Sequence, residues 1–315
     1  MRAAVALVVI AALWFALAPL GFGSWHHPLD ETPADHGLAF ETVTFQPRDE
    51  PRLLLRAWWM TEGIPKAGLV MVHGGGGNRA QPFTDWLQLA GTLAQHGYGV
   101  LALDLRNHGE SSDTPGGPTF GPDEANDVIA AIDFLQRRNP GMRFAAIGHS
   151  MGGQTALYAA ARDPRLEAVI SDSTYTDIAS ITPAFAHAAT GLPSLLFGAP
   201  FIWSAQHLHG LALDQAHAVD VIGSLAPRPV LLIHNAADPI VPLEQARALA
   251  QAYPGAELWI TSTPDAELPP ALRTRFGTHA RSYTLNPAAY ADRVTQFLDR
   301  TFAAPPSPGA TAPPP

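Results

Sequence analysis

Residues 143–154 decide the fold, and they read Arg143-Phe144-Ala145-Ala146-Ile147-Gly148-His149-Ser150-Met151-Gly152-Gly153-Gln154. An apolar run typical of a buried strand ends at Ser150, and a helical pattern begins directly behind it. The spelling G-x-S-x-G predicts a sharp turn from strand to helix that holds the serine hydroxyl clear of the sheet. Such a turn needs neighbours with almost no side chain, which the glycines provide. The pattern alone arises by chance about once in ten chains of this length, so the interpretation depends on partners elsewhere in the sequence.

Strand and helix patterns alternate on both sides of this turn. Besides the run before Ser150, strands are predicted at residues 40–45, 53–59, 68–73, 99–104, 166–170, 229–234 and 256–260. Helices are predicted at residues 83–96, 122–138, from the turn to about 162, 243–252 and 287–302. Buried strands that alternate with helices indicate an α/β fold, with a mostly parallel central sheet and helices on both faces.

Residues from about 174 to 222 interrupt this alternation. They contain helical pieces broken by proline and glycine, with many aromatic residues and leucines. Ligands bind at the carboxyl edge of the sheet in open α/β folds. We therefore expect this segment to be an inserted helical lid over that edge, within one domain that runs from about residue 33 to 302.

An acid and a histidine are available to activate Ser150. In a fold of this kind the order along the chain is nucleophile, acid, histidine. Asp238 follows the strand at 229–234, although it could instead cap the helix that starts near residue 242. Of the 13 histidines only His279 comes after Asp238, which makes it the predicted general base. Asp172, after the strand at 166–170, is the alternative acid.

Two backbone amides are predicted to bind the oxyanion. One belongs to Met151, the residue after the nucleophile, and the other to Gly75 in the four-glycine loop that follows the strand at 68–73. This loop lacks the Lys-Ser/Thr of a phosphate loop. His73 and His108 are expected to fix their loops by hydrogen bonds, and His149 to act in packing or behind the site rather than in the chemistry.

Several motifs now stand together in a recognisable order. They are Thr32 to Asp35, His73-Gly74-Gly75-Gly76-Gly77-Asn78-Arg79, Asp104-Leu105-Arg106-Asn107-His108-Gly109-Glu110-Ser111, the turn at Ser150, Pro227 to His234, and Tyr290 to Phe297. On these motifs the chain resembles the α/β-hydrolase superfamily, and within it the bacterial hydrolases grouped with serine aminopeptidases and lysophospholipase-like enzymes. The resemblance implies the same triad and oxyanion roles for Ser150, Asp238, His279, Gly75 and Met151.

Composition excludes several other classes of function. The chain has 315 residues and a formal net charge of -9, which disfavours a nucleic-acid partner. It has no cysteine, so a thiol nucleophile and cysteine-bound metal are excluded. His207 and His209 lack carboxylates at ligand spacing, so no metal site is expected, and the predicted chemistry needs no cofactor.

The two ends of the chain differ from its middle. Residues 3–22 carry no charge and are long enough to cross a bilayer, so residues 1–25 are predicted to be a transmembrane signal anchor. Trp14 and Trp25 would then lie at the membrane interface, with the catalytic domain outside the cytoplasm. The alternative is a signal peptide cleaved after Ala18, which would leave a secreted protein. Residues 303–315, rich in proline and alanine, are predicted to be a disordered tail.

The sequence thus predicts a serine hydrolase that cleaves an ester through an acyl-enzyme. Carboxylester hydrolysis is the expected activity, and a thioester is another substrate of the same chemistry. The apolar lid and the membrane segment make acylglycerol or lysophospholipid substrates plausible. An aminopeptidase-like amide hydrolase is the alternative on the same site. A binding protein that keeps the fold without the reaction is the alternative of another class, and it predicts a damaged triad.

Overall fold

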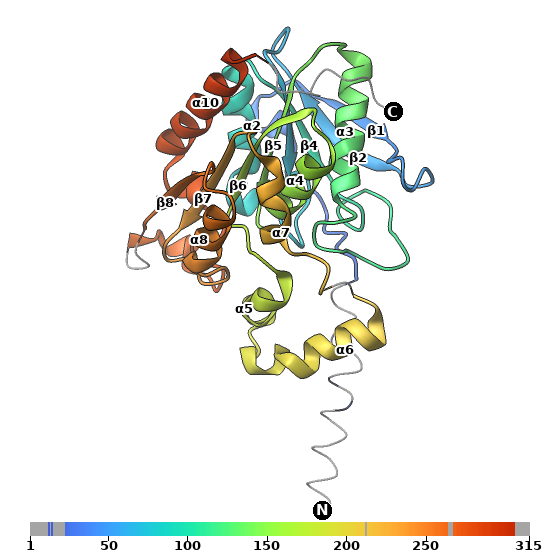
Figure 1. Ribbon diagram of the computed structural model, residues 1–315, viewed down its shortest axis with the longest axis vertical. Helices are drawn as coiled ribbons and strands as arrows, with labels where there is room; N and C mark the ends of the chain where they lie inside the picture. Colours follow the sequence, from blue (N-terminus) through green and yellow to red (C-terminus); the bar gives the residue numbers. More distant parts are fainter. Residues whose placement is uncertain (1–11, 13, 15–22, 212, 264–266, 306–315) are drawn as a thin grey trace, which may run out of the picture.

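Eight strands form one sheet in the order β1-β2-β4-β3-β5-β6-β7-β8 (Figure 1). The computed structural model describes residues 12, 14, 23–211, 213–263 and 267–305. β2 pairs antiparallel with β1 and β4, and all other neighbouring strands are parallel. The predicted α/β fold with a mostly parallel sheet is confirmed. The strands are β1 (Glu41–Phe45), β2 (Leu55–Met60), β3 (Gly68–Val72), β4 (Gly99–Leu103), β5 (Phe144–His149), β6 (Leu166–Asp172), β7 (Val230–Asn235) and β8 (Glu257–Thr261).

The strands are buried according to their position in the sheet. Every residue of the central strands β3, β4, β5, β6 and β7 is buried, because helices cover both faces of a parallel sheet. The edge strand β1 buries only Val43 and Phe45 and exposes its other three residues. Successive side chains of a strand point to opposite faces. Val70 and Val72 therefore belong to one hydrophobic core, and Leu69 and Met71 to the other.

Helices follow the strands and build these two cores. The longer helices are α2 (Trp86–Gln95), α3 (Ala125–Arg138), α4 (Met151–Arg162), α5 (Ile178–Thr190), α6 (Ala199–His209), α7 (Ala218–Ile222), α8 (Leu243–Ala252), α9 (Ser282–Leu285) and α10 (Pro287–Ala303). The short 3-10 helices are η2 (Pro33–His36), η3 (Pro82–Thr84), η4 (Ser194–Phe197), η5 (Gly223–Leu225) and η7 (Pro270–Leu272).

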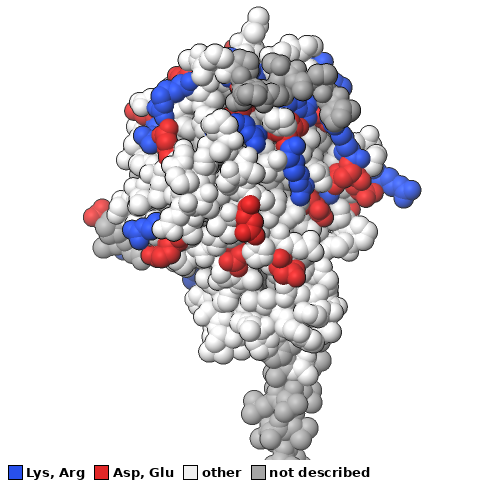
Figure 2. All heavy atoms as spheres, viewed as in Figure 1, with Lys and Arg blue, Asp and Glu red and all other residues white. Residues whose placement is uncertain are grey.

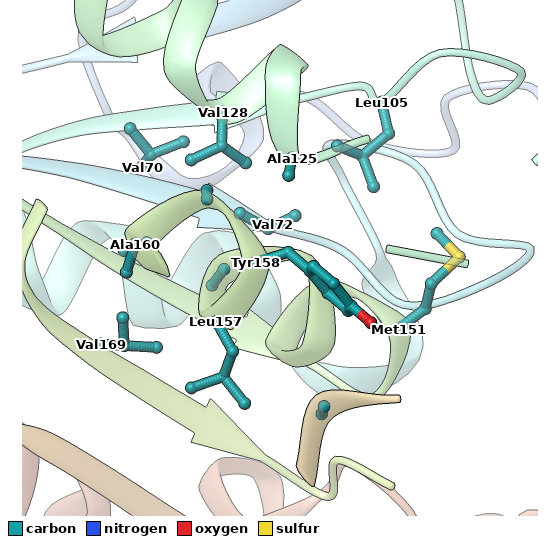
Figure 3. Close-up of a cluster of buried hydrophobic side chains, with 14 of the residues drawn as sticks. Val70, Val72, Leu105, Ala125, Val128, Met151, Leu157, Tyr158, Ala160 and Val169 are labelled. Carbon is teal, nitrogen blue, oxygen red and sulfur yellow. The ribbon is translucent and has the colours of Figure 1, made fainter. Parts of the chain in front are cut away.

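One core lies between the sheet and α3, α4, α7 and α8, and the other lies between the sheet and α2 and α10. Figure 3 shows the first, where Leu157 and Ala160 of α4 and Val128 of α3 meet Val70 and Val169 of the sheet. Each fully buried aliphatic side chain of this kind stabilises the fold by about 1.5–3 kcal/mol. Because α4 begins immediately after Ser150, this packing fixes the position of the serine.

The segment predicted to be a lid forms α5, η4, α6 and α7, and α5 and α6 lie beyond one edge of the sheet (Figure 1). Residues 178–213 contain no Lys, Arg, Asp or Glu, and Figure 2 shows the corresponding end of the molecule without charge. Phe197 and Phe201 pack together inside it, whereas Leu195 and Trp203 are exposed. That the segment closes over a bound substrate stays a prediction.

The predicted terminal segments fall largely outside the described residues. These are residues 1–11, 13 and 15–22 of the expected anchor, and residues 306–315 of the expected tail. Within the described part of the chain, no helix is both long and apolar enough to cross a membrane. The two tryptophans expected at a membrane interface both contact the domain. Trp14 Nε1 donates a hydrogen bond to Leu196 O at 3.1 Å, and the Trp25 ring packs on Phe120.

Candidate active site

Ser150 lies at the turn between β5 and α4, in a backbone conformation that few residues adopt. Its φ is 52° and its ψ is -117°, so the turn is strained, as expected for a nucleophile held clear of the sheet. A side chain at Gly148 would approach the carbonyl carbon of Gly152 to 2.3 Å, and one at Gly152 would approach Val72 O to 2.1 Å. Only glycine fits at either position, which explains the spelling of the motif.

His279 lies between Ser150 and Asp238. Its Nε2 is 3.1 Å from Ser150 Oγ, and its Nδ1 is 2.8 Å from Asp238 Oδ2. All three side chains are at least nine-tenths buried. Nδ1–H can therefore donate to the carboxylate while Nε2 accepts the serine proton. The structure brings together the three residues that the order along the chain selected, from the ends of β5 and β7 and from the loop after β8.

Asp238 is held in its turn by backbone amides. Its Oδ1 accepts hydrogen bonds from Ile240 N at 2.8 Å and Val241 N at 2.9 Å, which leaves Oδ2 for His279. Burial raises the pKa of Asp238, but the charge and hydrogen bond of His279 outweigh it, so the pKa lies below its usual value. Helix α8 is capped at Pro242, so Asp238 does not serve as its N-cap.

Gly75 and Met151 line one small pocket together with Ser150. Neither backbone amide has a hydrogen-bond partner within the described ranges of the chain. For Met151 this follows from its place as the first residue of α4, because the first N–H groups of a helix have no partner inside it. Two free amides beside a serine oxygen are what a developing oxyanion requires.

The loop that carries Gly75 is fixed by a side chain that the sequence analysis did not single out, Gln81. Its Oε1 accepts a hydrogen bond from Gly74 N at 2.6 Å, and its Nε2 lies 3.2 Å from His149 Nδ1. Gln81 itself has a left-handed backbone, with φ 39°. His149 thus acts behind the nucleophile, as expected, and its ring packs on Trp86 with the centroids 4.2 Å apart.

Asp172, the alternative acid, faces this buried network and not the triad. Its Oδ1 accepts a hydrogen bond from Ser173 Oγ at 3.0 Å, and its Oδ2 is 3.8 Å from His149 Nε2. Burial raises the pKa of Asp172 to about 7 and lowers the pKa of His149 to about 3. The carboxyl group that meets His279 in a hydrogen bond is therefore Asp238.

The glycine loop is tied to the loop that follows β4. The Arg79 guanidinium pairs with Asp104 and Glu110, so the loop after β3 is tied to the loop after β4. As expected, His73 and His108 fix their loops: Leu105 N donates to His73 Nε2 at 3.2 Å, and His108 Nδ1 lies 2.8 Å from Arg106 O. These contacts give the DLRNHGES motif a structural role.

A larger apolar cavity adjoins the pocket of Ser150. Its volume is about 700 Å³, and it shares Trp25, Gly75 and Phe185 with the smaller pocket. The walls come from the glycine loop, α5, η4 and the loop before His279. The lining residues are Trp14, Trp25, His27, Gly75, Gly76, Phe83, Phe185, Ala189, Thr190, Leu192, Phe197, Thr274, Phe276 and Arg281. Within the described residues, no cluster of His, Asp and Glu is spaced to hold a metal ion.

Comparisons with known proteins agree with the fold. The family described as alpha/beta hydrolase fold matches residues 69–197, and the family described as TAP-like protein matches residues 194–296. The uncharacterized protein YfhR of Escherichia coli strain K12 is 25% identical over 256 residues, which cover 77% of this chain and 78% of that protein. Human monoglyceride lipase is 31% identical over 107 residues, which cover 34% of each chain.

Solved structures show the same fold. The Pyrococcus furiosus esterase Pf2001 superposes with a TM-score of 0.70 at 23% identity, covering 88% of this chain and 98% of that one. Est1E from Butyrivibrio proteoclasticus, solved with ferulic acid bound, superposes with a TM-score of 0.61 at 18% identity. The match covers 83% of this chain and 100% of the Est1E chain. With the family matches, the strand order and the turn at Ser150 in agreement, the chain belongs to the α/β-hydrolase superfamily.

Proposed function

We propose that this protein is a serine hydrolase that cleaves carboxylic esters through an acyl-enzyme. The observation that carries the proposal is the position of His279, within hydrogen-bond distance of both Ser150 Oγ and Asp238 Oδ2. The amides of Gly75 and Met151, which have no hydrogen-bond partner among the described residues, belong to residues that line the same pocket as the serine. Acyl transfer needs a nucleophile, a base, an acid that orients the base, and donors for the oxyanion. The residues of this site are arranged to fill these four roles.

The reaction follows from these positions. Ser150 Oγ attacks the ester carbonyl while its proton passes to His279 Nε2, and Asp238 stabilises the resulting imidazolium. The oxyanion of the tetrahedral intermediate accepts hydrogen bonds from the amides of Gly75 and Met151. His279 then protonates the leaving alcohol. Water, activated by the same histidine, attacks the acyl-enzyme and releases the acid.

The cavity walls favour an ester over the substrate of an aminopeptidase. An enzyme that binds a free amino terminus needs an anionic group to hold it, because burying an unpaired ammonium is costly. Among the described residues that line the two adjoining pockets there is no aspartate and no glutamate. Their walls are mostly aromatic and aliphatic, as suits an acyl chain. The names of two similar proteins, an esterase and a monoglyceride lipase, point the same way.

Labelling with a fluorophosphonate probe tests the proposal directly. The wild-type chain should label and hydrolyse a p-nitrophenyl ester, whereas Ser150→Ala should do neither. Ser111→Ala is a matched control, because Ser111 is also buried but bonds to the backbone of Asp104 and Arg56, away from the triad. A wild-type chain that fails to label would instead support a binding protein that has kept the fold without the reaction.

For localisation we propose retention of the N-terminal segment, with the catalytic domain outside the cytoplasm. The proposal rests on the uncharged run of residues 3–22 and on the contact of Trp14 with Leu196, which a cleavage after Ala18 would remove. N-terminal sequencing of the mature protein from membrane and soluble fractions is the test. A mature chain that starts at Pro19 would mean a secreted protein.

A further inference from the structure

The apolar cavity beside Ser150 has a buried cation in its wall, Arg281. This residue is two positions beyond His279 and only 5% exposed, so its charge is held inside the protein. In the part of the chain that the structure describes, no aspartate or glutamate lines the cavity with it. Burying a charge without a partner is costly, which makes an arginine in such a place unusual unless it has an anion to bind.

The hydrogen bonds of Arg281 leave one end of its guanidinium unused. Nε donates to Phe83 O at 3.1 Å. Nη1 donates to Gly277 O at 2.8 Å, Leu272 O at 3.2 Å and Thr274 Oγ1 at 3.5 Å. An arginine has five N–H donors, and the two on Nη2 have no acceptor within the described ranges of the chain. All the acceptors found are neutral.

No carboxylate of the described residues compensates this charge by direct contact. Within the described residues, no Asp or Glu oxygen lies within the 4.0 Å of an ion pair with Arg281. Burial lowers the pKa of Arg281, and the more distant Asp85 only partly offsets this effect. Carbonyl groups thus hold the guanidinium in place, but they are neutral and do not balance its charge.

We propose that Arg281 binds an anionic group of the substrate, so that the esters cleaved by this protein carry a carboxylate or a phosphate near the scissile bond. The inference rests on the proposed esterase function and narrows its substrate class. Gly75 lines both the cavity of Arg281 and the pocket of Ser150, so one small molecule can reach both. Carboxylates and phosphates are the groups that guanidinium N–H donors bind best.

A purely structural role is the competing explanation, because Arg281 links the carbonyls of Phe83, Leu272 and Gly277. That role predicts loss of stability on substitution but no change in preference between charged and neutral esters. Selectivity therefore separates the two explanations, whereas activity alone does not.

The test compares pairs of esters that differ by one anionic group, on the full-length protein. For an anion on the acyl side, the pair is the p-nitrophenyl monoester of glutaric acid and p-nitrophenyl pentanoate. For an anion on the alcohol side, the pair is butyryl glycerol phosphate and monobutyrin. Each pair is measured as kcat/KM with wild type, Arg281→Gln, Arg281→Lys and Arg275→Gln. Arg275 is a matched control, because it lies on the same loop but is exposed and bonds to Ala188 O.

In one of the two pairs, we expect wild type to prefer the anionic ester by about 10- to 100-fold, the range of a charge-assisted hydrogen bond. Arg281→Gln should abolish that preference mainly through KM, Arg281→Lys should keep part of it, and Arg275→Gln should leave it unchanged. A wild type without preference in either pair overturns the proposal, as does a preference that survives Arg281→Gln. If Arg281→Gln does not fold, the proposal is judged by the kcat/KM ratios of anionic to neutral ester that wild type and Arg281→Lys show. Absence of both turnover and fluorophosphonate labelling would instead refute the esterase function itself.

Discussion

Asp172→Asn should remove a pH-dependent loss of stability while leaving most of the ester hydrolysis intact. The Asp172 carboxyl group is fully buried, and burial raises its pKa to about 7. Between the ordinary aspartate pKa of about 3.9 and this value, the folded protein keeps a proton that the unfolded chain has released. The stabilising effect of that proton is complete below the ordinary pKa and is lost as the pH rises through about 7.

The magnitude follows from the pKa shift. While only the folded state holds the proton, the free energy of unfolding falls by about 1.4 kcal/mol for each pH unit. From pH 5 to the raised pKa this amounts to about 3 kcal/mol, so wild type should lose about this much stability through Asp172 between pH 5 and pH 8. Asparagine keeps an oxygen that can accept the hydrogen bond of Ser173 Oγ and has no proton to lose in this range. Its new amide NH₂ group is a buried donor that lacks a ready acceptor, which lowers the stability of the variant by about 1–2 kcal/mol at every pH. The variant should thus be the less stable protein at pH 5 and the more stable one at pH 8.

Urea denaturation at the two pH values measures this difference, with the exposed Asp123→Asn as control for a simple change of charge. The same proteins are assayed with a p-nitrophenyl ester. If the difference in stability between variant and wild type stays the same at both pH values, the buried carboxyl group does not titrate as described. If Asp172→Asn lowers hydrolysis by several orders of magnitude, Asp172 rather than Asp238 is the acid of the site.

Three further changes test other parts of the structure. Asp238→Asn should lower kcat by about ten thousand-fold without unfolding the protein, because it loses the acceptor that orients the imidazole; a loss under tenfold would contradict the assigned role. Gln81→Leu frees the glycine loop, so kcat should fall about 10- to 100-fold with KM little changed, whereas the equally buried Gln154→Leu should not show this pattern. Gly109→Ala should destabilise the protein by about 2–4 kcal/mol in urea, because its methyl group would lie 2.3 Å from Asp104 Oδ2 at a φ of 52°; wild-type stability would show that the loop adapts.

The sequence was sufficient for the layout of the sheet and for three residues of the site, and the reason is physical. Apolar runs mark strands that are buried on both faces, and the parallel strands of this fold end at one edge. The order argument could therefore select Asp238 and His279 for Ser150, and the structure places them within hydrogen-bond distance. The antiparallel pairing of β2 was not predictable, because alternation marks a strand but not its direction.

Contacts between distant polar side chains could not be predicted. Gln81 meets His149 across 68 positions of the chain, and a glutamine after a glycine-rich loop carries no pattern that indicates such a contact. The same holds for Arg281. In the sequence it is one of three arginines of the same loop, with Arg273 and Arg275. Only the packing of the loop buries Arg281 and exposes the other two.

The contact of Trp14 with the lid segment makes the shape of the cavity depend on the N-terminal segment. Trp14 forms part of the cavity wall and packs edge-on against Phe197, with ring centroids 5.4 Å apart. Cleavage after Ala18 would therefore do more than release the protein from its leader. It would also remove an aromatic side chain from the cavity wall and leave the cavity wider and more open to water.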